Sequence, residues 1–131
     1  MTVKLNHTIV PANDKEESAR FYKQMFGFEY EGSMGHFAPV KIPSQSLTLD
    51  FEDSESFEPQ HYAFKVSEAE FDKIFARVVE WGLTYGSGPS CPENMRTNQW
   101  NGGLGVCFRD PGGHFLELLT HDYSAEQFAQ N

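Results

Sequence analysis

Four side chains in this sequence, two imidazoles and two carboxylates, are candidate ligands of a divalent metal ion: His7, His61, Glu117 and Asp50. Imidazole suits zinc, iron, nickel and cobalt, and a carboxylate adds negative charge and a hard oxygen ligand. Two histidines and one carboxylate with open positions form the facial arrangement of non-haem Fe(II) chemistry. A fourth protein ligand would favour a Lewis-acid site that enolises or isomerises its substrate. The four residues are far apart in the chain, so such a site requires a fold that brings them together.

An internal repeat gives the two histidines equivalent positions. The segments "LNHTIVPAND" at 5–14 and "PQHYAFKVSE" at 59–68 each carry a histidine early in a short apolar strand, just before the start of a helix. In each copy the helix is expected to end at a glycine, Gly27 or Gly82. The spacing from histidine to glycine differs by only one residue between the copies. The repeat therefore indicates a duplicated structural module.

Both expected helices have a start signal and an apolar stripe. Asn13 with Glu16, and Ser67 with Glu70, have the spacing of a capping box. Apolar residues then recur at helical spacing, and they are Ala19, Tyr22, Met25 and Phe26 in the first copy and Phe71, Ile74, Phe75, Val78 and Val79 in the second. Each copy thus begins as a strand followed by an amphipathic helix.

Three strands are expected after each helix. The last ones are "SLTLDFED" and "HFLELLT", which align so that one acidic residue, Asp50 or Glu117, has the same place in each copy. The other strands are expected at 28–32 and 36–42 in the first copy, and at 83–86 and 104–109 in the second. Pro39 indicates an edge strand or an irregular one. The sequence therefore predicts a single α+β domain of two modules, about 3–53 and 59–121, with a polar tail at 122–131.

Period-two alternation indicates that three candidate ligands point away from the residues that a helix would cover. His61, Asp50 and Glu117 alternate, respectively, with these apolar sets: Tyr62, Phe64 and Val66; Leu47, Leu49 and Phe51; Leu116 and Leu118. His114 falls on the face of Leu116 and is therefore disfavoured as a partner of Glu117.

The first strand gives no such separation. His7 shares its face with Leu5 and Ile9. This alternation would place Asn6 and Thr8 against the helix, which is not the apolar surface that a helix needs.

The connection at 86–103 is rich in glycine, proline and asparagine, and it exceeds the usual length, so it is expected to be functional or mobile. Its Arg96, Trp100 and Asn101 could close over a substrate, and a solvated loop with one anchoring aromatic fits the sequence equally well. Phe37, one of 12 phenylalanines, is a candidate for lining an apolar pocket, although core packing is the ordinary explanation for phenylalanine.

Each candidate ligand also has an ordinary structural interpretation, because a single histidine or glutamate in a strand is usually hydrogen-bonded or on the surface. The four are singled out because they occupy equivalent places in the repeat. Three other residues are interpreted as structural: His36 in an edge strand, His121 in solvent, and Arg109 paired near the turn that follows it.

Charge and hydropathy exclude several classes of partner. Ten Lys and Arg against 19 Asp and Glu give a net charge of −9, which argues against a nucleic-acid partner. We find no basic amphipathic stretch, no apolar run of membrane-spanning length and no signal-peptide pattern. Cys91 and Cys107 match no metal or redox spacing, and they are interpreted as reduced, inert thiols of a cytoplasmic protein.

Three segments resemble the vicinal oxygen chelate superfamily, which contains glyoxalase I, extradiol dioxygenases and bleomycin- and fosfomycin-resistance proteins: "LNHTIVPANDKEESARFYKQMFGFE", "HYAFKVSEAEFDKIFARVVEWG" and "GVCFRDPGGHFLELLT". The last is the most specific, because its run from "DP" to a ligand glutamate recurs in that superfamily. The resemblance implies two βαβββ modules in an open, cupped barrel around one divalent metal ion, which could be Fe, Zn, Ni, Mn or Co. It implies a homodimer as well.

The resemblance also implies roles for the candidate residues. His7, His61 and Glu117 match the three shared metal ligands, and Asp50 falls at the fourth ligand position of glyoxalase I-like members, one methylene shorter than the usual glutamate. We therefore expect a glyoxalase-like isomerase or lyase that acts on a small substrate chelating the metal through vicinal oxygens, with Glu117 and Asp50 as catalytic groups. The alternatives are an extradiol-type dioxygenase using Fe(II) or Mn(II), and a metal-free binding or resistance protein.

Overall fold

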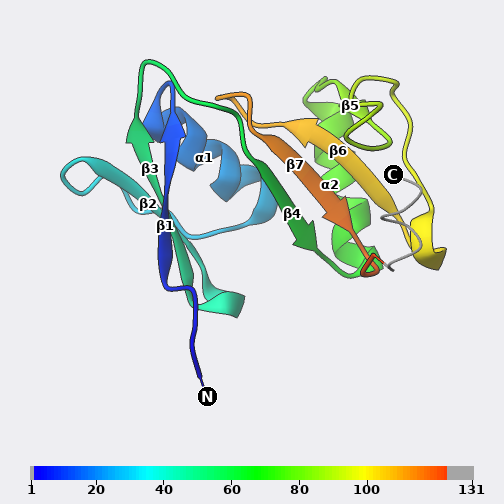
Figure 1. Ribbon diagram of the computed structural model, residues 1–131, viewed down its shortest axis with the longest axis horizontal. Coiled ribbons are helices and arrows are strands. Elements are labelled where there is room, and N and C mark those ends of the chain that lie inside the picture. Colours follow the sequence, from blue (N-terminus) through cyan, green and yellow to red (C-terminus); the bar gives the residue numbers. More distant parts are fainter. Residues whose placement is uncertain (1, 124–131) are drawn as a thin grey trace. The chain divides into compact units, whose positions relative to one another are not determined.

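A computed structural model describes residues 2–123 of the chain (Figure 1). Contacts divide the chain into two units, the first ending at Glu58 and the second beginning at Pro59. Each unit has one α-helix and one small β-sheet, so the secondary structure is of the α+β class. Within the described residues, neither helix has the length and apolar character needed to cross a membrane.

The sheet of the first unit has three strands. Its elements are β1 (His7–Ala12), α1 (Lys15–Phe26), β2 (Phe37–Ile42), a short 3-10 helix (Pro43–Gln45) and β3 (Leu47–Asp53). The strand order is β1-β3-β2, with β1 parallel and β2 antiparallel to β3. Pro39 therefore lies in an edge strand, as predicted, where a residue without an N–H group costs the sheet least.

The strand expected at 28–32 is reduced to one bridge, between Glu29 and Lys41. Gly27 and Gly32 flank this stretch with φ angles of 77° and 113°, which are outside the extended conformation. The extended run between them is too short to continue along β2. The prediction of three strands after the helix of the first unit is therefore wrong, because only β2 and β3 form there.

The cap of α1 also differs from the prediction by one residue. Asp14, and not Asn13, is the N-cap, and its side chain accepts hydrogen bonds from the backbone N–H groups of Glu16 and Glu17 at 3.0 and 3.2 Å. Asparagine and aspartate are equally good caps, so their order in the sequence could not decide between them. Gly27 ends the helix with a left-handed φ of 77°, as expected.

The sheet of the second unit has four strands in the order β4-β7-β6-β5. Its elements are β4 (His61–Lys65), α2 (Glu68–Glu80), β5 (Tyr85–Gly86), a short 3-10 helix (Trp100–Gly102), β6 (Gly105–Arg109) and β7 (Phe115–Leu119). Ser67 and Glu70 form the predicted capping box, with bonds of 3.1 and 2.9 Å. β4 is parallel to β7, whereas β6 is antiparallel to it.

A tight turn at Asp110 joins β6 to β7. The Asp110 side chain is 6% exposed, and its Oδ1 accepts hydrogen bonds from the N–H groups of Gly112 and His114 at 3.0 and 2.9 Å. Gly113 has a φ of 96°, a backbone angle that residues other than glycine rarely adopt. The turn thus fixes the start of β7, the strand that carries Glu117.

Replacing Asp110 with alanine is expected to lower the free energy of unfolding by about 2 kcal/mol, because one buried and one half-buried N–H group lose their acceptor. Asp110→Asn is the matched control, because its side-chain oxygen can still accept both bonds. Urea unfolding followed by circular dichroism measures both variants. Equal stability of Asp110→Ala and the parent would contradict this account of the turn.

Candidate functional site

Glu117 lies in the centre of β7 on the face of the sheet opposite the core. Its neighbours in the chain, Leu116 and Leu118, are fully buried, and its cross-strand partners are Ala63 of β4 and Cys107 of β6. The Glu117 side chain is itself only 3% exposed. A carboxylate so well removed from water requires partners for its oxygens.

His61 supplies a partner for the first oxygen. Its Nε2 lies 2.9 Å from Oε1 of Glu117, and its side chain is 40% exposed at the edge strand β4. The structure therefore brings together two of the four predicted ligands, on the face that the alternation predicted. One of the two is buried and fixed, and the other is accessible to solvent.

Tyr123 supplies a partner for the second oxygen. Its hydroxyl group donates a hydrogen bond to Oε2 of Glu117, and its ring lies edge-on to Trp100 with centroids 5.9 Å apart. Burial and the adjacent Glu117 carboxylate raise the pKa of Tyr123 above the ordinary value of tyrosine, so the phenol stays protonated and remains a donor. The sequence prediction missed this contact, because Tyr123 lies beyond the last strand, in the expected tail. Residues 124–131 of that tail lie outside the described part of the chain.

Cys107 lies beside Glu117 but is not a thiolate. It is fully buried, and burial together with the charge of Glu117 raises the pKa of its thiol to about 12. The thiol therefore stays protonated at neutral pH and is a poor nucleophile. This agrees with the interpretation of Cys107 as inert, whereas Cys91 is exposed.

His7 and Asp50 lie on one face of the sheet of the first unit. The helix side of β1 consists of Val10 and Ala12, which are buried, whereas His7 and Ile9 are exposed on the other face. The sequence left open which face of β1 points toward the core. The second half of the strand decides this, because Val10 and Ala12 are buried there. Nδ1 of His7 lies 2.8 Å from Oδ1 of Asn6, so Nε2 is the ring nitrogen that this contact leaves available.

Asp50 is half-buried in the central strand of this sheet, between Ile9 of β1 and Pro39 of β2. Phe37 is half-buried on the same face, opposite Glu52. The first unit thus presents an imidazole, a carboxylate and an aromatic ring on the face that α1 does not cover.

The candidate substrate-binding residues of the second unit lie in an ordered loop. Trp100 and Asn101 are half-buried in the short 3-10 helix, and Arg96 is exposed. Asn98, which the sequence analysis did not single out, is 9% exposed, donates to the Ser87 carbonyl at 2.6 Å and accepts from the N–H of Trp100 at 3.1 Å. Side-chain bonds to the backbone therefore hold the loop in place.

The other three histidines and Arg109 have contacts or positions outside the candidate site. His114 is fully buried, accepts a bond from the N–H of Gln60 at 2.9 Å and packs edge-on against the Tyr62 ring. His36 lies in the turn before β2 and not in the edge strand, and His121 is exposed, with its ring 3.0 Å from the Thr120 hydroxyl. The guanidinium group of Arg109 lies 4.5 Å from the centre of the Phe115 ring, so it pairs near the turn with an aromatic ring.

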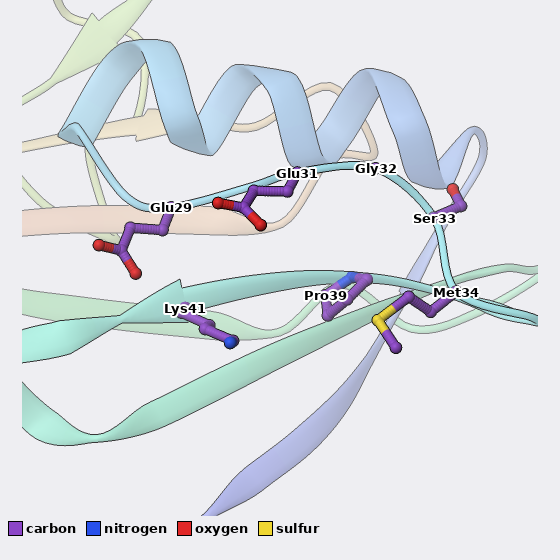
Figure 2. Close-up of a pocket in the computed structure, with 7 residues that line it drawn as sticks. All are labelled: Glu29, Glu31, Gly32, Ser33, Met34, Pro39 and Lys41. Atoms are coloured by element: carbon purple, nitrogen blue, oxygen red, sulfur yellow. The ribbon is translucent and has the colours of Figure 1, made fainter.

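The first unit also has a surface hollow of about 220 Å³ (Figure 2). Glu29 and Glu31 reach into it from the segment after α1, and Lys41 and Pro39 come from β2. These charged side chains are exposed, and none of the predicted ligands lines the hollow. It therefore carries no part of the candidate site.

One imidazole and one carboxylate, His61 and Glu117, are the donor pair that the structure brings together. Within residues 2–123, no three His, Cys, Asp or Glu side chains form a ready-made metal group. Two ligand atoms that bind one ion at about 2.1 Å and at right angles to each other are about 3.0 Å apart. Nε2 of His61 and Oε1 of Glu117 are 2.9 Å apart, which is a hydrogen-bond distance that is also close to this separation.

Comparisons with known proteins agree with the fold. The sequence profile of the Glyoxalase/Bleomycin resistance protein/Dioxygenase superfamily matches residues 4–118. Metallothiol transferase FosB of Lysinibacillus sphaericus (strain C3-41) is 28% identical over 126 residues, covering 92% of this chain and 84% of that protein. The structure of Oxidase ChaP-H2 is 50% identical with a TM-score of 0.88, covering 95% of this chain and 98% of that one. Oxidase ChaP-H1 is 41% identical with a TM-score of 0.86, covering 95% and 100%. The expected α+β fold is thus confirmed.

Proposed function

Because the chain belongs to the glyoxalase/bleomycin resistance protein/dioxygenase superfamily, we propose that it is a metal-dependent oxidase of a small molecule with two adjacent oxygens. The observation that carries the proposal is the His61–Glu117 pair, an accessible imidazole 2.9 Å from a buried carboxylate. The choice of oxygen chemistry is supported by 50% identity to an oxidase, against 28% to a thiol transferase.

His61 and Glu117 would hold the ion through Nε2 and Oε1, and His7 is proposed as the third ligand because its position in the repeat matches that of His61. This set is the two-histidine, one-carboxylate arrangement with open positions. A redox-active divalent ion, Fe(II) or Mn(II), would polarise the two substrate oxygens and support the reaction of the substrate with molecular oxygen.

The other residues would bind the substrate and move its proton. Trp100 and Phe37 offer aromatic surface for a planar molecule, and Arg96 and Asn101 offer donors to its oxygens. Asp50 would accept the proton that a substrate hydroxyl loses, as a general base. The sequence alone favoured an isomerase or lyase because Asp50 matches a fourth ligand position. Similarity to the oxidases favours giving Asp50 the base role and leaving that coordination position open.

Asp50→Asn tests this role separately from metal binding. We expect the variant to keep the metal content of the parent and to lose turnover by about 100-fold or more, because a neutral amide cannot accept the proton. Metal analysis and steady-state rates measure the two effects. Loss of the metal in Asp50→Asn would instead identify Asp50 as a ligand and favour isomerase chemistry.

The function itself is tested with protein loaded anaerobically with Fe(II), in three parallel assays. The first assay measures oxygen uptake with an oxygen electrode in the presence of each of several catechols. The second measures hemithioacetal isomerisation, and the third measures thiol addition to the epoxide fosfomycin. We expect oxygen uptake with at least one catechol, dependent on the metal and lost in His61→Ala. The thiol assay is included because of the similarity to FosB. Turnover in the second or third assay without oxygen uptake would contradict the proposal.

A further inference from the structure

The two oxygens of the Glu117 carboxylate have different partners. Oε1 lies 2.9 Å from Nε2 of His61, and Oε2 accepts a hydrogen bond from the hydroxyl group of Tyr123. We propose that Tyr123 is a positioning residue that holds Oε2 and so presents Glu117 to the metal as a ligand through Oε1 alone. This inference rests on the proposed metal site and adds a residue to which no role has been assigned.

The Tyr123 ring is held in place by a second contact, with Trp100. Its ring packs edge-on against Trp100, with an angle of 61° between the ring planes. Trp100 in turn lies against Gly88, where a Cβ atom would be only 2.6 Å from the indole ring. The backbone N–H of Trp100 donates a hydrogen bond to Oδ1 of Asn98 at 3.1 Å. A continuous set of contacts thus connects the loop at 86–103 to the carboxylate. These contacts fix the position of the Tyr123 side chain, so its hydroxyl group is a positioned hydrogen-bond donor.

The consequence for metal binding follows from the geometry of a carboxylate. With Oε2 occupied, Glu117 can turn only one oxygen toward an ion, on the side where His61 lies. Without the hydroxyl group the carboxylate can rotate or bind through both oxygens. The partners that orient metal ligands typically change metal affinity by about 10- to 100-fold when they are removed. We therefore expect Tyr123→Phe to weaken metal binding by about 10-fold.

The test uses Co²⁺ as the probe, because its visible d–d absorption reports the coordination number. Titration of metal-free protein gives the affinity, and the band intensity gives the geometry, since intensity falls as the coordination number rises. Tyr123→Phe should bind Co²⁺ about 10-fold more weakly and with an altered band. Tyr85→Phe is the matched control, because Tyr85 packs against Phe75 on the helix side of the sheet and should behave as the parent.

The outcomes separate this inference from the proposed function. If the parent binds Co²⁺ and Tyr123→Phe binds it with the same affinity and spectrum, the positioning role is overturned and the metal site stands. If the parent binds no Co²⁺, the proposed function fails, and a readout without metal then decides whether Tyr123 holds Glu117. That readout is a slowly exchanging Tyr123 hydroxyl proton in the NMR spectrum, expected in the parent and shifted in Glu117→Gln. Its absence from the parent would overturn the inference.

Discussion

Replacing Glu117 with glutamine is expected to lower the affinity for the metal by more than about 100-fold, which exceeds the effect of removing an outer partner. The carboxylate lies 2.9 Å from Nε2 of His61 and is the anionic member of this pair. Glutamine has the same size, and its amide can still form hydrogen bonds with Tyr123 and His61. The variant therefore removes the charge and leaves the packing.

The metal-free fold should tolerate this change. A carboxylate that is 3% exposed costs free energy to bury, so the melting temperature of metal-free Glu117→Gln should equal or exceed that of the parent. Glu80→Gln, at the exposed end of α2, removes the same charge and is the control. Elemental analysis and thermal unfolding measure the two effects. Metal retained by Glu117→Gln, or a loss of stability without metal, would each contradict the assigned role.

Periodicity predicted the part of the site that lies in regular strands. The alternation in β7 placed Glu117 opposite Leu116 and Leu118, and the alternation in β4 placed His61 on the matching face. Parallel pairing of β4 with β7 then makes the two residues neighbours, with Ala63 opposite Glu117. The same rule assigns His114 to the face opposite Glu117, because residues separated by an odd number of positions in a strand point to opposite faces.

The features that the sequence prediction missed lie in irregular segments, where neither the strand period nor the helix period applies. Tyr123 reaches Glu117 from beyond the last strand, and Asn98 fixes the loop through bonds to the backbone. Neither contact has a sequence spacing that distinguishes it from an ordinary tail or loop residue. The lost strand at 28–32 depends on positive φ angles at Gly27 and Gly32, which are compatible with the sequence but not dictated by it.

The five histidines of the chain provide a test of whether the two repeats serve one ion. His7 and His61 are the proposed ligands and should each be required, so His7→Ala and His61→Ala should each reduce metal content from about one ion per chain to near zero. His36→Ala and His121→Ala are controls from exposed positions and should keep the metal. His114→Ala should lower stability by about 2 kcal/mol, because a buried hydrogen bond is lost, without a loss of metal from the folded protein.

The stoichiometry decides between one shared ion and two separate sites. If His7 with Asp50 and His61 with Glu117 each held an ion of their own, the parent would bind two ions per chain, and each alanine variant would keep one. If the repeats share a single ion, the parent binds one, and either substitution removes it, because two protein ligands that remain cannot hold it tightly. Elemental analysis of the parent and both variants, prepared with the same excess of Zn²⁺ and then desalted, distinguishes these results. The second pattern is the one that the proposed ligand set of His7, His61 and Glu117 predicts.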